Sequence, residues 1–119
     1  MSITRKMYLE SAWSNTFGAS LANLITGSGD LVGLHIHNEH PADIYIQVFD
    51  ALAANVTLGT TSPKFSFEIP AGGSREENPG TMGPIHFNTA ISYAATTEST
   101  GGTAASTSPV RGKLLYKSL

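Results

Sequence analysis

The chain has 119 residues, no cysteine, a formal net charge of −2 and only 13% charged residues. This length fits one domain of about 100–150 residues, and the absence of cysteine excludes disulfides, zinc–thiolate sites and a cysteine nucleophile. The slightly acidic balance offers nothing to a phosphate backbone, so we expect no nucleic-acid partner.

The first 30 residues are ambiguous. Residues 1–13 lack the apolar stretch of a signal peptide, and no apolar run approaches the ~18–20 residues that cross a bilayer. We therefore expect a soluble protein, made in the cytoplasm of the cell that produces it, with no membrane partner. Residues 7–25 fit a helical stripe, a strand followed by a loop, or an arm lying on a neighbouring subunit, although Ser14, Asn15 and Gly18 disfavour a helix. We treat residues 1–30 as an extended N-terminal arm or first strand, open to intersubunit contact, and residues 31–119 as the folded domain.

Five later runs alternate apolar and polar side chains with period two, the pattern of half-buried antiparallel strands. These runs span residues 34–37, 44–49, 65–69, 91–96 and 110–117. Gly/Pro-rich turns separate them, and a low-complexity loop covers residues 98–109. The pattern predicts an all-β chain, a single antiparallel β-sandwich of about seven strands, jelly-roll or immunoglobulin-like. The side chains predicted to face its core include Ile91, Tyr93, Leu114 and Tyr116.

Three histidines, His35, His37 and His40, lie within six residues, and His86 is the fourth. Two histidines at positions i and i+2 of a strand share one face, which suits a metal ion. The alternative is a polar, solvent-facing strand surface. Because no carboxylate stands at a clear ligand spacing, we assign no metal site and no cofactor.

No segment forms a recognisable catalytic motif. Glu76 and Glu77 follow Arg75 in a predicted turn, where adjacent carboxylates point apart instead of flanking a cleft. The segment Gly72-Gly-Ser-Arg75 is neither a nucleophile elbow nor a phosphate-binding loop. We therefore predict no catalytic residues and no enzyme. An enzyme would need His86, or the histidines at 35–40, in a cleft with a partner acid.

Aromatic residues offer two further interpretations. They could form a stacking platform for bases or sugars, or they could be core residues and cross-strand pairs. The residues concerned are Trp13, Phe17, Tyr45, Phe49, Tyr93 and Tyr116.

Several segments, taken in order, carry a resemblance to a known class of proteins. They are Gly33-Leu-His-Ile-His-Asn38, Ile44-Tyr-Ile-Gln-Val-Phe-Asp50, Leu58-Gly-Thr-Thr-Ser-Pro63, Phe65-Ser-Phe-Glu-Ile-Pro-Ala-Gly-Gly73, Phe87-Asn-Thr-Ala-Ile-Ser-Tyr-Ala-Ala-Thr96 and Gly112-Lys-Leu-Leu-Tyr-Lys117. From residue 34 onward the chain resembles the small β-sandwich virion accessory proteins, of decoration or cement type, of tailed bacteriophages. Ala90 stands where a glycine would be expected, and residues 1–30 have no counterpart.

The resemblance implies a structural virion protein with no enzymatic residues. The first expectation is a capsid decoration or cement protein on the capsid surface, which binds the assembled major capsid protein lattice and stabilises it. The alternative is a tail, neck or fibre module that faces a receptor or glycan. A homo-oligomer is expected, and a trimer is a guess from the three-fold sites of such shells. The contacts are expected at the N-terminal segment and at an exposed sheet edge, with the loop 98–109 as the freest surface.

Overall fold

The computed structural model describes residues 10–14, 21–78, 83–100 and 110–118, and only the backbone of residues 10–14. One 3₁₀ turn, η1 (Ala53–Asn55), and nine strands make up this part. The strands are β1 (Glu10–Ser14), β2 (Ala22–Ile25), β3 (Gly29–Asn38), β4 (Ile44–Phe49), β5 (Phe65–Ile69), β6 (Ser74–Glu77), β7 (Ile85–Phe87), β8 (Ile91–Thr96) and β9 (Val110–Ser118). In these ranges no helix has the length and apolar character needed to cross a membrane.

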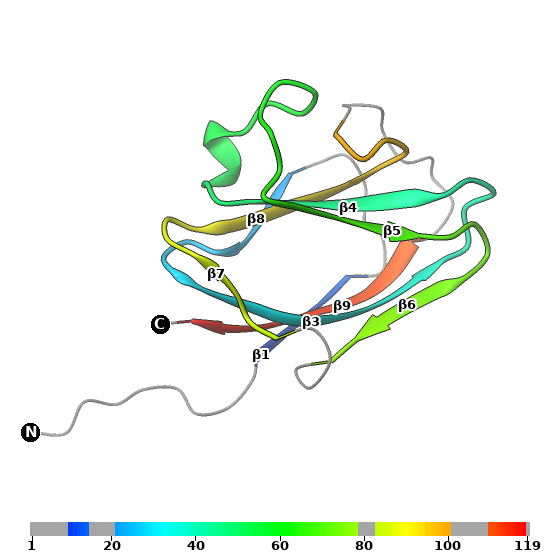
Figure 1. Cartoon of the computed structure of the whole chain (residues 1–119), viewed down its shortest axis with the longest axis horizontal. Helices are drawn as coiled ribbons and strands as arrows, with labels where there is room; N and C mark the ends of the chain where they lie inside the picture. The colour runs from blue at the N-terminus through cyan, green and yellow to red at the C-terminus, as the bar shows by residue number, and fades with distance from the viewer. Residues whose placement is uncertain (1–9, 15–20, 79–82, 101–109, 119) are drawn as a thin grey trace, which may run out of the picture.

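The strands form two antiparallel sheets that lie face to face (Figure 1). Sheet A has the order β1-β9-β3-β6, with β7 also paired to β3, and sheet B has the order β2-β8-β4-β5. When the short β7 is set aside, the strands follow the orders first–eighth–third–sixth and second–seventh–fourth–fifth, which define a jelly roll. The predicted all-β sandwich is confirmed, and its strand order is that of a jelly roll.

All five predicted strands are present, and β3 starts five residues earlier than its alternating run. The other four strands, β1, β2, β6 and β7, are three to five residues long. In β2, β6 and β7, with three or four residues each, period two cannot stand out from chance, and β1 lies in the region whose pattern was ambiguous. The sequence therefore predicted about seven strands, whereas the described part of the chain has nine.

The described part of the N-terminal 30 residues pairs within the same chain. β1 lies beside β9, from Glu10 opposite Tyr116 to Ser14 opposite Gly112. β2 lies beside β8 in sheet B, with a register shift between Asn23 and Ile25. Each sheet therefore receives one edge strand from this region. Residues 1–9 and 15–20 of the expected arm lie outside the described residues.

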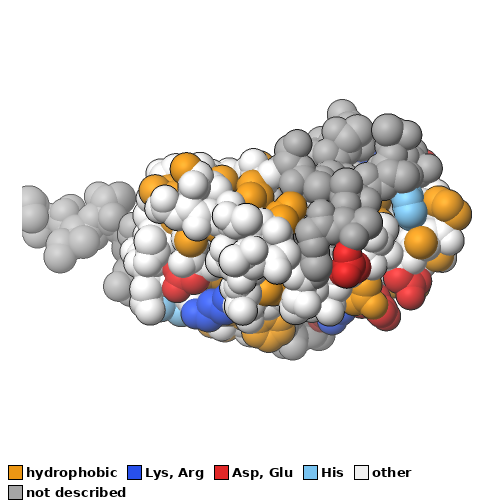
Figure 2. Space-filling view, turned by 90° about the horizontal axis from the view of Figure 1, so that it is seen from above, with side chains coloured by type: hydrophobic (Ala, Val, Ile, Leu, Met, Phe, Trp, Pro, Cys, Tyr) orange, Lys and Arg blue, Asp and Glu red, His pale blue; other side chains and the backbone are white. Residues whose placement is uncertain are grey.

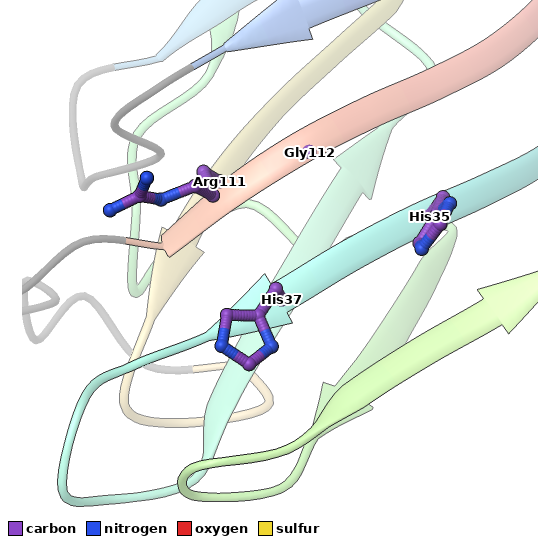
Figure 3. A pocket seen from close by; sticks show the side chains of 4 residues that line it. All are labelled: His35, His37, Arg111 and Gly112. Carbon is purple, nitrogen blue, oxygen red and sulfur yellow. The ribbon is translucent and has the colours of Figure 1, made fainter.

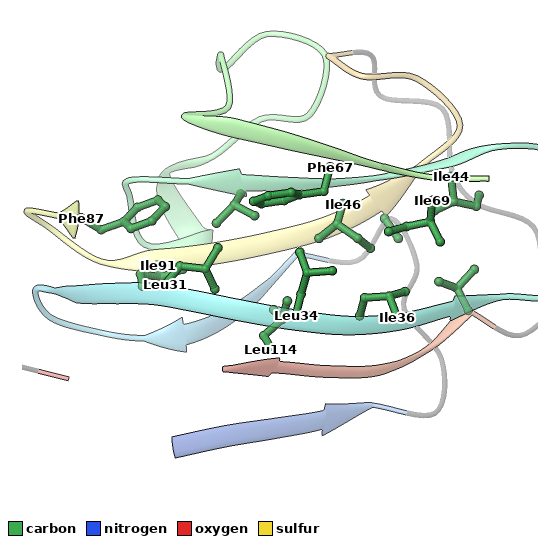
Figure 4. Close-up of a cluster of buried hydrophobic side chains, with 13 residues drawn as sticks. Leu31, Leu34, Ile36, Ile44, Ile46, Phe67, Ile69, Phe87, Ile91 and Leu114 are labelled. Carbon is green, nitrogen blue, oxygen red and sulfur yellow. The ribbon is translucent and has the colours of Figure 1, made fainter. Parts of the chain in front are cut away.

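Apolar side chains from both sheets fill the space between them (Figure 4). Ile91 and Leu114 are fully buried there as predicted, Tyr93 packs against the cluster, and Tyr116 is half-buried. Burial of each large aliphatic side chain stabilises the fold by about 1.5–3 kcal/mol. The buried cluster consists of Leu31, Leu34, Ile36, Ile44, Ile46, Val48, Phe67, Ile69, Phe87, Ile91, Ala95, Val110 and Leu114.

A buried amide joins two turns at one end of the sandwich. Asn38, at the end of β3, donates from Nδ2 to the carbonyl oxygens of Ala42 at 3.0 Å and Ile69 at 3.1 Å. Its Oδ1 accepts from the backbone N–H of His40 at 2.8 Å. These bonds tie the β3–β4 turn to the end of β5, and they explain why an asparagine ends this strand.

Candidate functional site

Two histidines project from the outer face of sheet A. His35 and His37 lie two residues apart on β3, with 53% and 43% of their side chains exposed. Together with Arg111 and Gly112 of β9 they line a shallow hollow of about 150 Å³ (Figure 3). The hollow exists because β9 runs beside β3, with Arg111 opposite His37 and Gly112 opposite Ile36.

Gly112 is required where the two strands approach most closely. Its φ is +152°, and a Cβ at this position would overlap the carbonyl oxygen of His35. Only glycine accepts such a contact without shifting the backbone. Gly112 therefore brings β9 close to β3 at this point of the sheet.

Each basic group around the hollow already has a polar partner. His37 Nδ1 lies 2.7 Å from Ser74 Oγ, and its Nε2 lies 3.8 Å from Glu39 Oε1. Arg111 Nη2 donates to Glu39 Oε2 at 3.2 Å. His35 Nδ1 lies 3.4 Å from Glu76 Oε2. Because these groups already bond to one another, the hollow suits polar contacts with another surface better than capture of a free ion.

A second hollow of about 230 Å³ lies on the other side of His35. Leu34, Lys113, Leu115 and the segment from Glu76 to Asn78 line it together with His35. The two hollows follow β3 and β9 on the same face of sheet A. We call this face, from Arg111 to Leu115 on β9 and from His35 to His37 on β3, the polar strip.

The third predicted histidine does not join the other two. His40 is 7% exposed, and its Nδ1 accepts from the backbone N–H of Ala42 at 3.1 Å within its own turn. Among the described residues no group of three His, Cys, Asp or Glu side chains is placed to hold a metal ion. The three histidines are close in sequence, but the turn after Asn38 places His40 away from the strand face that carries His35 and His37.

His86 has an acidic neighbour that the sequence did not indicate. Its Nδ1 lies 2.7 Å from Asp30 Oδ1, because β7 pairs with the start of β3 and brings these residues opposite each other. His86 and Asp30 are 49% and 21% exposed, and neither lines the hollows described above. The pair is thus partly exposed to solvent, on a strand pairing away from His35 and His37.

The predicted turn at Arg75, Glu76 and Glu77 is wrong, because these residues form the edge strand β6. β6 pairs with β3, which places Glu76 opposite His35. Glu77 faces the other way and lies 3.3 Å from the guanidinium of Arg75. The two carboxylates do point apart, as period two in a strand requires.

The four predicted aromatic residues whose side chains are described do not form one platform, and the side chain of Trp13 lies outside the description. Phe49 is buried and Tyr93 packs against the core, whereas Tyr116 belongs to the other sheet. Tyr45 donates from its hydroxyl to Glu68 Oε2 at 2.8 Å on sheet B. Phe17, like most of the loop 98–109, lies outside the described residues.

A residue that the sequence did not single out is Phe65, at the start of the edge strand β5. It is 45% exposed, more than any other large hydrophobic side chain in the described ranges. No local signal in the sequence marked it, because Phe65 alternates with Ser66 just as the buried Phe67 does.

The protein is a jelly roll whose interior is filled by apolar side chains. The candidate contact residues described above lie on its outer faces and edges. Comparison with known proteins finds no matching family model, no matching curated protein and no matching solved structure.

Proposed function

We propose that this chain is a structural virion protein, a capsid decoration or cement protein that binds the assembled major capsid protein lattice. The observation that carries the proposal is the filled jelly roll, in which thirteen buried apolar side chains occupy the space between the sheets. Jelly rolls are frequent among viral capsid and lectin domains. A filled interior leaves the faces and edges of the sandwich as its means of contact with a partner. The resemblance of residues 34–119 to phage decoration proteins supports the same role.

The mechanism is mechanical and needs no catalytic group or cofactor. A protein that binds only the assembled lattice stabilises it by mass action, as any ligand of a native state does. Many copies held by the symmetry of the shell act together through multivalency. We place the protein on the capsid surface, after synthesis in the host cytoplasm, as a homo-oligomer without nucleic-acid or membrane contacts.

Copy number tests this proposal directly. Quantitative mass spectrometry of purified phage particles should find hundreds of copies of this chain per particle. Particles that lack the chain should release their DNA at a lower temperature than complete particles. Absence of the chain from purified particles, or equal heat resistance without it, would contradict a role as cement.

The second candidate is a tail, neck or fibre module that binds a host glycan or protein. The polar strip favours it, because imidazole, guanidinium and carboxylate groups side by side supply the hydrogen bonds that polar ligands need. Between a few and a few dozen copies per particle would support this role. A glycan array, with the H35A/H37A double variant as control, would then test the ligand.

The N-terminal segment remains part of the proposal as a capsid contact. Deletion of residues 1–20 is a poor test, because it removes β1 and uncovers the edge of β9. Deletion of residues 1–9 keeps every described strand. We expect this shorter deletion to reduce the number of copies bound per capsid in a co-sedimentation assay, with an unchanged melting temperature. Full occupancy by the shortened chain would rule out the segment as the adhesive part.

A further inference from the structure

The edge strand β5 combines three features that its pairing with β4 leaves unused. The first is Phe65, whose exposed ring stacks on Phe67 with centroids 5.3 Å apart and an interplanar angle of 21°. The stacking holds this apolar side chain in place at the border of the sandwich. A fixed, exposed aromatic ring is the usual anchor of a protein contact.

The second feature is an open backbone edge. β5 pairs with β4 along all five of its residues, and no other described strand pairs with it. Arg75 of β6 donates from Nη1 to the carbonyl oxygen of Glu68 at 3.3 Å, so this carbonyl faces away from β4. Because peptide groups alternate along a strand, the N–H and C=O of Ser66 face the same open edge.

The third feature is the hydroxyl of Ser66. Its Oγ is shielded from water and has no hydrogen-bond partner in the described part of the chain. A buried polar group without a partner is destabilising, so such groups are rare in native structures. Ser66 lies on the outer face of sheet B, beside Gln47 of β4.

We propose that β5 pairs with β5 of a second copy of this chain, antiparallel and about a two-fold axis at Phe67. In this register Ser66 stands opposite Glu68 of the second copy, and Phe65 stands opposite Ile69. The two four-stranded sheets B become one continuous sheet. The contact does not depend on the proposed role in a virion.

This register satisfies the unused groups. Directly opposed side chains lie close enough to interact. The Ser66 hydroxyl, which its own chain shields from water, turns about the Cα–Cβ bond toward the paired edge and donates to the carboxylate of Glu68 of the second copy. That carboxylate can accept this bond as well as the one from Tyr45, since its oxygens offer several acceptor sites. Phe65 comes to lie at the border of the second copy, where the opposed Ile69 is itself fully buried in its own core. The Arg75 guanidinium, whose Cζ lies 5.4 Å from the centre of the Phe67 ring, must leave the Glu68 carbonyl. It keeps Glu77, whose Oε1 lies 3.3 Å from its Nη2.

The neighbouring registers are less favourable. A two-fold axis at Glu68 would place two carboxylates directly opposite each other, which is destabilising. An axis at Ser66 would bring Lys64 opposite Glu68, but the Lys64 ammonium already lies over the Phe87 ring and donates to the His86 carbonyl. The edge β6 is a poorer site for pairing, because three of its four residues are charged.

Five residues make a small interface, well below the about 1,200 Å² of stable complexes. We therefore expect a weak dimer with a Kd of about 0.1–1 mM, near the lower limit of specific association. Sedimentation equilibrium of the full chain up to about 2 mM should show a rise from the 12.5 kDa monomer toward twice that mass. A mass that stays at the monomer, or one that rises to a closed trimer, overturns the proposal.

Charge substitutions locate the contact. Phe65→Lys places an ammonium group at the paired edge and should raise the Kd at least about tenfold. Ser74→Lys adds the same charge to the exposed edge strand β6 and should leave the Kd unchanged. Equal association by F65K and wild type overturns the proposal. The proposal is also overturned if the wild-type chain stays monomeric in solution and the F65K variant loses capsid binding. That result would assign the β5 edge to a strand of the capsid protein.

Cysteine pairing tests the register and does not require F65K to fold. The natural chain has no cysteine, so every disulfide formed is an engineered one. A mixture of Ser66→Cys and Glu68→Cys chains should oxidise to a cross-linked heterodimer, because opposed residues have Cα atoms at disulfide distance. Each variant alone should remain uncross-linked. Cross-linking of S66C alone or E68C alone, or none in the mixture, overturns the two-fold axis at Phe67.

Discussion

The outer faces of the two sheets have similar alternating sequences and opposite surroundings. On sheet A, His35 and Glu76 are more than half exposed, and charged side chains lie side by side along the polar strip. On sheet B, the outward residues Gln47, Ser92 and Thr96 are fully buried. Seen from the sheet B side, the described surface shows few charged side chains, and these lie in the lower half of the view (Figure 2). A polar residue in an alternating strand is therefore no guarantee of a solvent-facing position.

The polar side chains on the buried outer face of sheet B are tolerated because they form hydrogen bonds with neighbouring segments of the chain. Gln47 Nε2 donates to Thr96 Oγ1 at 2.7 Å and to the carbonyl of Glu98 at 3.0 Å. Ser92 Oγ donates to the carbonyl of Ala51 at 2.7 Å. Ala51, which follows β4, and Glu98, which follows β8, thus supply the hydrogen-bond acceptors on sheet B. On the exposed face of sheet A, water can take this part.

The largest expected difference between the two faces comes from adding the same charge to each. Ala94 is 1% exposed on the outer face of sheet B, so Ala94→Lys must bury an ammonium group and should destabilise the fold by about 3–5 kcal/mol. His35→Lys, on the exposed face of sheet A, should change stability by less than about 0.5 kcal/mol. Urea unfolding followed by far-UV circular dichroism measures both. Similar losses for the two variants would show that the outer faces do not differ in this way.

A smaller effect is expected at Asp50, which follows β4 and accepts from three backbone N–H groups. Partial burial alone would raise the pKa of Asp50, but the N–H groups of Thr89, Asn88 and Ala90 and the charge of Lys64 hold it below its ordinary value of 3.8. Charged Asp50 therefore stabilises the fold above that pH, and this contribution disappears as the pH falls through the lowered folded-state pKa. Asp50→Asn should cost about 2 kcal/mol at pH 7.

Urea unfolding of wild type and D50N between pH 7 and pH 3 checks this expectation. The two stability curves should converge as the pH falls below 3.8. Glu76→Gln, which removes a carboxylate from the exposed face of sheet A, should change stability at pH 7 by less than about 0.5 kcal/mol. A constant difference between D50N and wild type over the whole range would refute the assigned role of the carboxylate.

The smallest expected effect compares one hydrogen bond on each face. Thr96→Val removes the hydroxyl that accepts from Gln47 on the buried face and should cost about 1–2 kcal/mol, or about 4–8 °C in Tm. Ser74→Ala removes the partner of His37 on the exposed face, where water can replace it, and should cost less than about 0.5 kcal/mol. Differential scanning calorimetry resolves the two values. Equal shifts in Tm would mean that Thr96 is as accessible to water as Ser74.

The candidate sites were predicted less well than the strands. Period two located His35 and His37 on one strand face, but the hollow beside them depends on the approach of β9 at Gly112. His86 and Asp30 are 56 positions apart in the chain, and they meet only because β7 pairs with the start of β3. No local pattern indicates contacts of this kind, since they depend on which strands become neighbours.

The sequence by itself determined the fold class, the five predicted strands and most of the core, because period two and side-chain volume are local properties of each strand. Tertiary structure decided the jelly-roll order, the edge position of β5 and β6, and which outer face meets water. These features depend on pairing between distant segments, and their energies come from non-local burial and hydrogen bonds. Phe65 is an example of both. The sequence predicts its place in an alternating strand with Ser66 and Phe67, but its exposure follows only from the position of β5 at the border of sheet B.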